Sequence, residues 1–277
     1  MAFENKEIFT TLISSPKINF DQSNMLKESL LIILLKMNSK FYKNISFKME
    51  CMEELIKRGA NVNVVDRKGK PALIYAIEEE KEEKGHAYRM VEILLNNAAD
   101  PNILENCNLI DETEKEYYRE ITITIFFEHF NLFQEILVEI LIEPPLDLPN
   151  DKTPLFYAIQ LNSFPLVKLL IEKGADPMQK VSHFFFGEKN SLITAAMHGR
   201  FKIFKYLYKT YYKNSTYIQN VNNKIQIIIC CFQSKETEIF EYLLDKKYKT
   251  GKEELQELLL KFILISKKVE FIQCLSN

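Results

Sequence analysis

Cysteine and histidine are the side chains of this chain that could carry nucleophilic or metal chemistry. There are five cysteines and four histidines in 277 residues. A cysteine nucleophile needs a base beside it, and Cys107 with His129 is the pair that the sequence could offer. No motif around either residue supports that pair, and the spacing of the cysteines and histidines does not match a zinc site. The glycine motifs of nucleotide-binding loops and of serine hydrolases are also missing. We therefore expect no catalytic, cofactor-binding or metal-binding residues.

Nucleic-acid binding is a second chemistry that one stretch could support. Lysines and tyrosines alternate there, at Lys202, Lys205, Tyr208, Lys209, Tyr212 and Lys213. Such a pattern can hold phosphates and stack bases. An amphipathic helix with a basic solvated face gives the same spacing. Because no other feature favours nucleic acid, we expect a different partner.

Charge is balanced over the whole chain but not along it. The chain has 36 basic and 38 acidic side chains. Acidic residues dominate from Glu78 to Glu120, and basic residues dominate from Arg200 to the end. Two interpretations stay open. The two regions are ordinary solvated faces, or each steers a partner of opposite charge.

The sequence also bounds the compartment. No apolar run reaches the roughly 18 residues that a membrane helix needs. The first residues, MAFENKEIFT, do not form a signal-peptide pattern. The five cysteines are an odd number, which is typical of reduced, buried thiols. We expect a cytoplasmic protein in a reducing compartment, without a membrane span and monomeric by itself.

Residues 151–180 carry the start and stop signals of two short helices. The segment reads DKTPLFYAIQLNSFPLVKLLIEKGADPMQK. Thr153 before Pro154 suits a helix start, because proline at the first helical position has no N–H to leave unpaired. Gly174 after the apolar run suits a helix stop, because glycine enters the left-handed region at little cost. Each helix has a single apolar face, so the pair needs neighbours to be stable.

This segment resembles one ankyrin repeat almost from end to end. Thr153-Pro154-Leu155, the small Ala158 and Gly174-Ala175-Asp176 stand at the positions of the family motif. The resemblance implies an all-α ankyrin-repeat solenoid of about six to seven stacked helix-turn-helix units with degenerate end repeats. We expect a lead-in or cap over residues 1–25 and the solenoid over residues 26–277. Its approximate units are 26–65, 66–104, 105–147, 148–180, 181–220, 221–250 and 251–277.

Several segments depart from the repeat. The first helix of the first unit is expected over Leu26–Lys36, and Ala98 stands where the family has glycine. Insertions in a solenoid fall in loops on one face. We interpret four segments as such insertions: Met37–Lys48, Glu78–Tyr88, Cys107–Arg119 and Val181–Asn190. The run Glu79–Glu83 could instead extend a helix, because its residues are good helix formers.

The last insertion contains three consecutive aromatic residues, Phe184, Phe185 and Phe186. Three neighbouring side chains in a loop cannot all face one core. The loop either folds back over the adjacent repeat as a lid or exposes an aromatic anchor for a partner.

The resemblance implies a non-enzymatic protein–protein interaction module that binds a partner protein through its finger loops and concave face. The family's contact positions, carried over to this chain, are Arg67, Lys68, Lys70, Glu78, Glu79, Asn150, Lys152, Gln160, Leu161, Lys180, Met197 and His198, and the aromatic run Phe184–Phe186 lies beside them. One alternative is a secreted effector of an intracellular bacterium that recruits or inhibits a host protein with the same surface. The composition, rich in Lys, Ile, Asn, Phe and Tyr, is typical of AT-rich genomes, which include such bacteria, protists and large DNA viruses. The other alternative is a degenerate enzyme.

Overall fold

The computed structural model describes residues 19–20, 22–37, 45–81, 85–105, 152–183, 187–234 and 237–245. The chain divides into two compact units. Unit 1 comprises Met1–Leu109 with Asp151–Asp176, and unit 2 comprises Ile110–Asn150 with Pro177–Asn277. Helices dominate both, and the strands of the described residues form one two-stranded hairpin. Each unit is described by itself.

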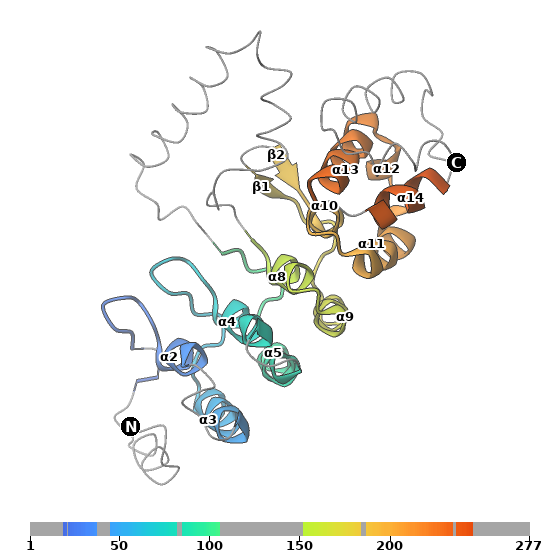
Figure 1. Cartoon of the computed structure of the whole chain (residues 1–277). Coiled ribbons are helices and arrows are strands. Elements are labelled where there is room, and N and C mark those ends of the chain that lie inside the picture. Colours follow the sequence, from blue (N-terminus) through green and yellow to red (C-terminus); the bar gives the residue numbers. More distant parts are fainter. Residues whose placement is uncertain are drawn as a thin grey trace. The chain divides into compact units, whose positions relative to one another are not determined.

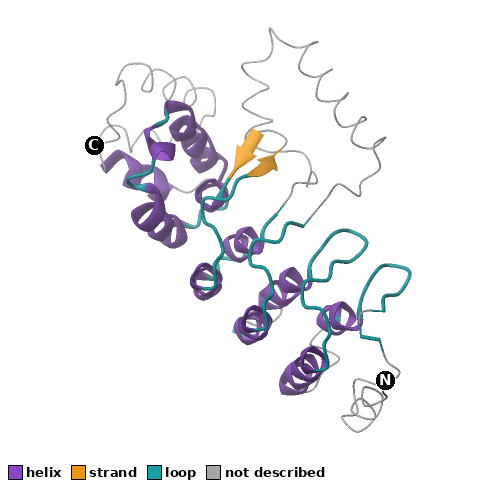
Figure 2. Ribbon diagram, turned by 180° about the vertical axis from the view of Figure 1, so that it is seen from behind, coloured by secondary structure: helices purple, strands orange, loops and turns teal. Residues whose placement is uncertain are grey.

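The described part of unit 1 consists of three helix pairs. They are α2 (Leu30–Lys36) with α3 (Ile45–Lys57), α4 (Ala72–Glu78) with α5 (His86–Asn96), and α8 (Pro154–Gln160) with α9 (Phe164–Glu172). A short 3-10 turn, η3 (Glu79–Lys81), follows α4. The first helices pack in the order α2, α4, α8, and the second helices in the order α3, α5, α9 (Figure 1). Figure 2 shows the loops that join them in teal. The apolar faces of both rows form the core, with Leu31, Met52, Ile74, Leu94 and Leu170 fully buried.

Side-chain and backbone caps fix where these helices begin and end. The hydroxyls of Ser29 and Thr153 accept hydrogen bonds from the amides of Ile32 and Phe156, so α2 and α8 each start one residue later. At the ends of α5 and α9, Ala98 and Gly174 both adopt positive φ, 65° and 96°. The predicted start and stop of the 151–180 segment are confirmed. Ala98 takes the left-handed conformation although it is not glycine.

The start of α2 differs from the expectation. The helix was expected from Leu26, but it begins at Leu30. The side-chain oxygen of Asn24 accepts hydrogen bonds from the amides of Leu26 and Glu28, which holds this stretch in a turn. Lys27 has a φ of 56°, a value that a right-handed helix cannot contain.

The order of the repeats also differs from the expectation. The pair α8/α9 packs directly against α4/α5. The described helices of the expected units 66–104 and 148–180 are therefore adjacent, and of the expected unit 105–147 the structure describes only Glu105. An isolated antiparallel bridge joins Glu105 to Lys152, with the amide of Glu105 2.9 Å from the carbonyl oxygen of Lys152. The chain thus leaves the stack at Glu105 and returns beside the same point. The segment 106–151 lies outside the described residues.

Two asparagines tie successive repeats together at the same place. Asn63 donates to the carbonyl oxygen of Ala98 (3.1 Å) and accepts from the amide of Asp100 (2.8 Å). Asn102 makes the same two bonds to Gly174 (2.9 Å) and Asp176 (2.7 Å). Because both bonds recur with the same partners, the register between α4/α5 and α8/α9 is that of adjacent repeats.

The first element in the described part of unit 2 is a hairpin, β1 (Val181–His183) paired antiparallel with β2 (Gly187–Lys189). Helices α10 (Ser191–Met197) and α11 (Phe201–Leu207) follow, and the π-helical turn η5 (Tyr208–Tyr212) continues α11. Three further helices complete the described part: α12 (Thr216–Gln219), α13 (Val221–Ser234) and α14 (Thr237–Asp245). Helix α10 packs on α13, and α11 packs on α14. The hairpin lies where a lengthened finger was expected, and Phe184–Phe186 at its turn lie outside the described residues.

Tyr212 anchors η5 inside unit 2. Its side chain is fully buried, and its hydroxyl donates to the carbonyl oxygen of Pro177 at 2.5 Å. Cys230 and Cys231 of α13 are also fully buried. Among the helices that the structure describes, none combines the length and the apolar character required to cross a membrane.

Candidate functional site

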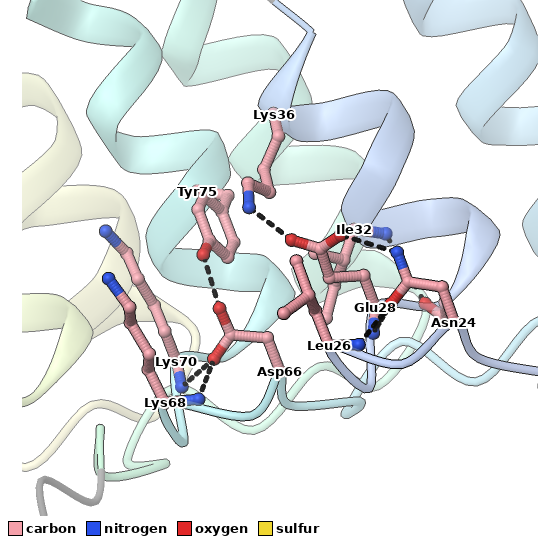
Figure 3. Close-up of polar contacts among 10 residues, drawn as sticks. Asn24, Leu26, Glu28, Ile32, Lys36, Asp66, Lys68, Lys70 and Tyr75 are labelled. Atoms are coloured by element: carbon pink, nitrogen blue, oxygen red, sulfur yellow. Dashed lines mark hydrogen bonds and ion pairs between the residues drawn. The ribbon is translucent and has the colours of Figure 1, made fainter. Parts of the chain in front are cut away.

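The turn before α4, here called the second finger (residues 66–70), is fixed by one buried carboxylate. Oδ1 of Asp66 accepts hydrogen bonds from the amides of Lys68 (2.8 Å) and Lys70 (3.0 Å). Its Oδ2 accepts the hydroxyl of Tyr75 at 2.6 Å (Figure 3). Asp66 is 5% exposed, so its carboxylate is largely shielded from water. The finger is therefore held rigidly against the first helix of its own repeat.

The turn before α2, the first finger (residues 24–28), has the same construction. Asn24 replaces Asp66, and its side-chain oxygen accepts from the amides of Leu26 (2.9 Å) and Glu28 (3.0 Å). Lys27 occupies the left-handed position that Gly69 holds in the second finger. The amide of Arg67 donates to the carbonyl oxygen of Leu26 at 2.8 Å. This bond joins the two fingers into one continuous edge.

Helix α8, the first helix of the third pair, makes the same tyrosine contact with a different carboxylate. The hydroxyl of Tyr157 donates to Oε2 of Glu105 at 2.5 Å, as Tyr75 does to Asp66. Lys152, the bridge partner of Glu105, stands at the position of Lys70. Acid, lysine and tyrosine thus recur in consecutive repeats of the stack.

Lysines and tyrosines of unit 1 alternate across the first helices. The ammonium group of Lys36 lies 5.7 Å from the centre of the Tyr75 ring, and that of Lys70 lies 4.6 Å from it. Lys70 is also 5.6 Å from the Tyr157 ring, and Lys152 is 5.4 Å from the same ring. A cation over an aromatic face is attracted by the quadrupole of the ring. These contacts hold the lysine side chains in place along the surface.

The carboxylates of this surface are already paired inside the protein. Glu28 binds Lys36 and Asn24, and the hydrogen bond from Lys36 holds the pKa of Glu28 below its usual value. Burial acts to raise the pKa of Glu78, but its bonds to Lys70 and Lys81 outweigh burial and lower it. The pKa of Tyr75 is raised by burial and by its bond to Asp66, so the phenol stays neutral and remains a donor.

Exposed groups of opposite character lie at the tips of the fingers. Arg67 and Lys68 are exposed, and Lys152 is half-buried. In the first finger, Met25 is 97% exposed and Leu26 50%. The finger tips therefore present cationic and apolar side chains on turns that Asn24 and Asp66 hold in place. Such a surface can contact another macromolecule. The tips hold no group that is arranged for bond-breaking chemistry.

The structure divides the expected contact residues between the two units. Unit 1 contains Arg67, Lys68, Lys70, Glu78, Lys152, Gln160 and Leu161, and all of these are at least partly exposed. Unit 2 contains Lys180, Met197 and His198. Lys180 is exposed and pairs with Glu188 at 2.7 Å. Asn150 and Phe184–Phe186 lie outside the described residues.

Glu79 is not part of the accessible surface, which corrects the expectation for this residue. Its side chain is 6% exposed, and its Oε2 accepts from the fully buried ammonium group of Lys48 at 2.9 Å. The sequence could not reveal this pair, because Lys48 is 31 residues away on another helix.

The sequence interpretation missed Met25, Leu26 and the two tyrosines. Asn24 and Asp66 each cap a turn that ends four residues later, so matching these two spacings would have identified the first finger. The tyrosines carried no such signal, because a tyrosine in a helix that faces its neighbours usually packs in a core.

The basic and aromatic stretch in unit 2 does not form a surface for nucleic-acid bases. Tyr208 and Tyr212 are buried, and Tyr208 packs edge-on against Tyr242 of α14. Bases stack on exposed aromatic faces. The helical interpretation of this stretch is therefore the better one.

Unit 2 contains a polar cavity of about 330 Å3 between the hairpin and helices α12 and α13. Its lining residues are Lys180, Glu188, Lys189, Asn190, Tyr217, Asn223 and Gln226. Burial raises the pKa of Tyr217 to about 12. No cluster of three or more metal-ligating side chains occurs among the residues that the structure describes.

Comparison with known proteins agrees with this geometry. The sequence model of the ankyrin repeat matches residues 150–181. The putative ankyrin repeat protein L92 of Acanthamoeba polyphaga mimivirus is 38% identical over 88 residues. That match covers 32% of this chain and 18% of the viral protein, so the chain spans less than a fifth of that relative.

Two solved structures are similar at low identity. The human ASB11 ankyrin repeat domain is 14% identical, with 81% of this chain and 78% of that chain covered and a TM-score of 0.44. The complex of the predatory endopeptidase Bd0816 from Bdellovibrio bacteriovorus with immunity protein Bd3460 contains a chain that is 17% identical, with 74% and 92% covered and a TM-score of 0.34. Neither TM-score is high enough to carry an argument.

Ankyrin repeats are in general modules of protein–protein interaction. The matched motif at residues 150–181 contains the helix pair α8/α9 of unit 1. The chain contains an ankyrin repeat at residues 150–181 and is similar to ankyrin-repeat proteins.

Proposed function

We propose that this chain is a non-enzymatic protein-binding module that meets its partner with the fingers and first helices of unit 1. The observation that carries the proposal is the finger pair. Asn24 and Asp66 satisfy the turn amides internally, and the Arg67–Leu26 bond fixes one finger against the next. A surface that is ordered before binding loses little conformational freedom when a partner docks.

The expected residues of unit 1 contribute unequally to this surface. Arg67 and Lys68 project from the finger tip, while Lys70 and Glu78 pair with each other at 2.5 Å. We propose that Arg67 and Lys68 contact the partner. The ion pair with Glu78 would hold the Lys70 side chain in position. The positions of unit 2, Lys180, Met197 and His198, remain proposed contacts of the same kind.

A capture experiment tests the proposal. The biotinylated protein is incubated with eukaryotic lysate and with bacterial lysate, and bound proteins are identified by mass spectrometry. We expect Arg67→Ala/Lys68→Ala to lose the partner that wild type captures. Lys168→Ala/Lys173→Ala removes two exposed lysines, one in α9 and one at its C-cap, and is the matched control. Equal capture by both double variants would place the contact elsewhere. Capture from eukaryotic lysate alone would favour the secreted-effector hypothesis.

The reducing cytoplasm is the location that we propose. Cys51, Cys230 and Cys231 are buried and form no disulfide with any residue that the structure describes. Buried thiols of this kind suit a compartment in which disulfides do not persist.

A further inference from the structure

We propose that the two fingers of unit 1 bind an acidic linear segment of the partner that also carries a bulky apolar side chain. The binding surface, here called the finger edge, comprises Met25, Leu26, Arg67, Lys68 and Lys152. This inference rests on the proposed protein-binding function and names the chemistry of the partner.

The apolar requirement follows from the first finger. Met25 is 97% exposed and Leu26 50% exposed, side by side at the tip of a turn that Asn24 holds rigid. Isolated exposed apolar residues are ordinary on protein surfaces. Here two of them are adjacent on a fixed backbone, and the flexible thioether of methionine adapts to varied apolar groups. A leucine or aromatic side chain of a partner segment would remove both from water.

The acidic requirement follows from unequal pairing of charge. Asp66 is used by two amides and a tyrosine, Glu105 by a tyrosine, and Glu28 by Lys36 and Asn24. By contrast, Arg67 and Lys68 are exposed and form no ion pair with any residue that the structure describes. The carboxylates are turned inward and the cations outward, so the finger edge presents positive charge.

The apolar and cationic tips lie next to each other, so the apolar and acidic residues of the partner must also be neighbours. Because the amide of Arg67 is bonded to the carbonyl oxygen of Leu26, the cationic tip begins where the apolar tip ends. An extended peptide with an apolar residue next to two or three carboxylates can contact both tips at once. Its carboxylates would form charge-assisted hydrogen bonds with the guanidinium and ammonium groups.

A nucleic-acid strand suits this surface less well. Phosphates could pair with the cations, but bases need open aromatic faces. Tyr75 and Tyr157 direct their hydroxyls to Asp66 and Glu105, and lysines lie over their rings. The exposed Met25 and Leu26 would gain nothing from a phosphate backbone.

Selection from a display library of random linear peptides, with the full chain as bait, tests the proposal. We expect enriched peptides to carry Asp or Glu next to Leu, Ile, Phe or Trp. A fluorescein-labelled copy of one enriched peptide is then titrated by anisotropy. Charge reversal in Arg67→Glu/Lys68→Glu should weaken binding about tenfold or more, and added salt should weaken wild-type binding as well. Met25→Ser/Leu26→Ser should weaken binding with little change in its salt dependence. The control Lys168→Glu/Lys173→Glu makes the same charge change in α9 and at its C-cap, and this variant should bind as wild type does.

Each other outcome overturns the inference. Enriched peptides without acidic residues, or peptides that bind all variants equally, refute the partner chemistry and leave the protein-binding function standing. No enriched peptide, together with partner capture from lysate, shows that the partner is recognised as a folded surface and not as a linear segment. Self-association of the protein that Arg67→Glu/Lys68→Glu abolishes would assign the finger edge to a second copy of this chain. Failure of both selection and capture would refute the proposed function itself.

Discussion

Replacing Lys48 with methionine tests how the first two repeats of unit 1 are joined. The Lys48 side chain is fully buried in α3. Its ammonium group donates to the carbonyl oxygens of Leu35 (3.1 Å) and Met37 (2.9 Å) at the end of α2, and to Oε2 of Glu79 (2.9 Å) after α4. One side chain therefore caps a helix of the first repeat and neutralises an acid of the second.

The magnitude follows from what Lys48→Met leaves behind. Methionine keeps most of the apolar volume but leaves the Glu79 carboxylate buried without its cation, which typically costs about 3–5 kcal/mol. Losing the bond to the buried carbonyl group of Leu35 adds about 1–3 kcal/mol, and losing the bond to the half-buried Met37 carbonyl adds less because water can reach it. The expected loss in the free energy of unfolding of unit 1 is therefore at the upper end of single-residue effects. Replacing both members, in Lys48→Met/Glu79→Leu, should recover part of this loss because no charge is left buried.

The assay is urea unfolding followed by circular dichroism, with hydrogen exchange of α3 and α4 peptides to locate the change in unit 1. The two single variants and the double variant form a cycle that isolates the coupling between the side chains. We expect a coupling of about 2 kcal/mol or more that high salt barely reduces, because the pair is shielded from solvent. A Lys48→Met protein within about 1 kcal/mol of wild type would refute this reasoning.

Three further predictions concern helix ends and thiols. Ala98→Gly should stabilise unit 1 by about 0.5–1 kcal/mol and Gly174→Ala should destabilise it by about 1 kcal/mol, because both positions have positive φ. Urea unfolding of both variants measures the two changes in stability. Changes of the same sign would contradict the reasoning. Thr153→Ala should cost about 1 kcal/mol through loss of the cap on α8, and Thr153→Ser should restore most of it. Burial raises the pKa of the Cys230 and Cys231 thiols, so iodoacetamide should not label them at neutral pH until urea unfolds unit 2. Mass-spectrometric mapping of the labelled residues checks this. Rapid labelling of the native protein would show that α13 exposes these thiols without unfolding.

Local signals in the sequence predicted the helix pair of residues 151–180 because its caps act within a few residues. Thr153 bonds to an amide three residues away, and Gly174 needs only its own φ. The predicted all-α ankyrin-repeat fold is confirmed for the same reason, since one face of each short helix is apolar throughout. Ala98 shows the limit of residue type, because the repeated turn imposes a left-handed conformation on alanine too.

Long-range register could not be predicted in this way. Residues 105–147 contain helix-spaced apolar residues, so the pattern indicated another stacked unit. The helix pairs that are adjacent are joined by long-range contacts, such as the bond of Asn102 to Gly174, 72 residues apart. Similarly, Glu79 is charged and lies in an acidic run, which suggests solvent exposure. Its burial depends on Lys48 reaching it from α3.

Because Glu105 and Lys152 are bridged, the packing of the repeats does not depend on how many residues connect them. In the sequence three residues separate Asp66 from Lys70 and 46 residues separate Glu105 from Lys152, yet both pairs form the same backbone hydrogen bond. Closing a loop roughly fifteen times longer adds only about 2 kcal/mol of chain entropy, and no contact of α8 or α9 has to shift. The segment between Glu105 and Lys152 can therefore change in length or sequence during evolution. The packing of α4/α5 against α8/α9 would be kept.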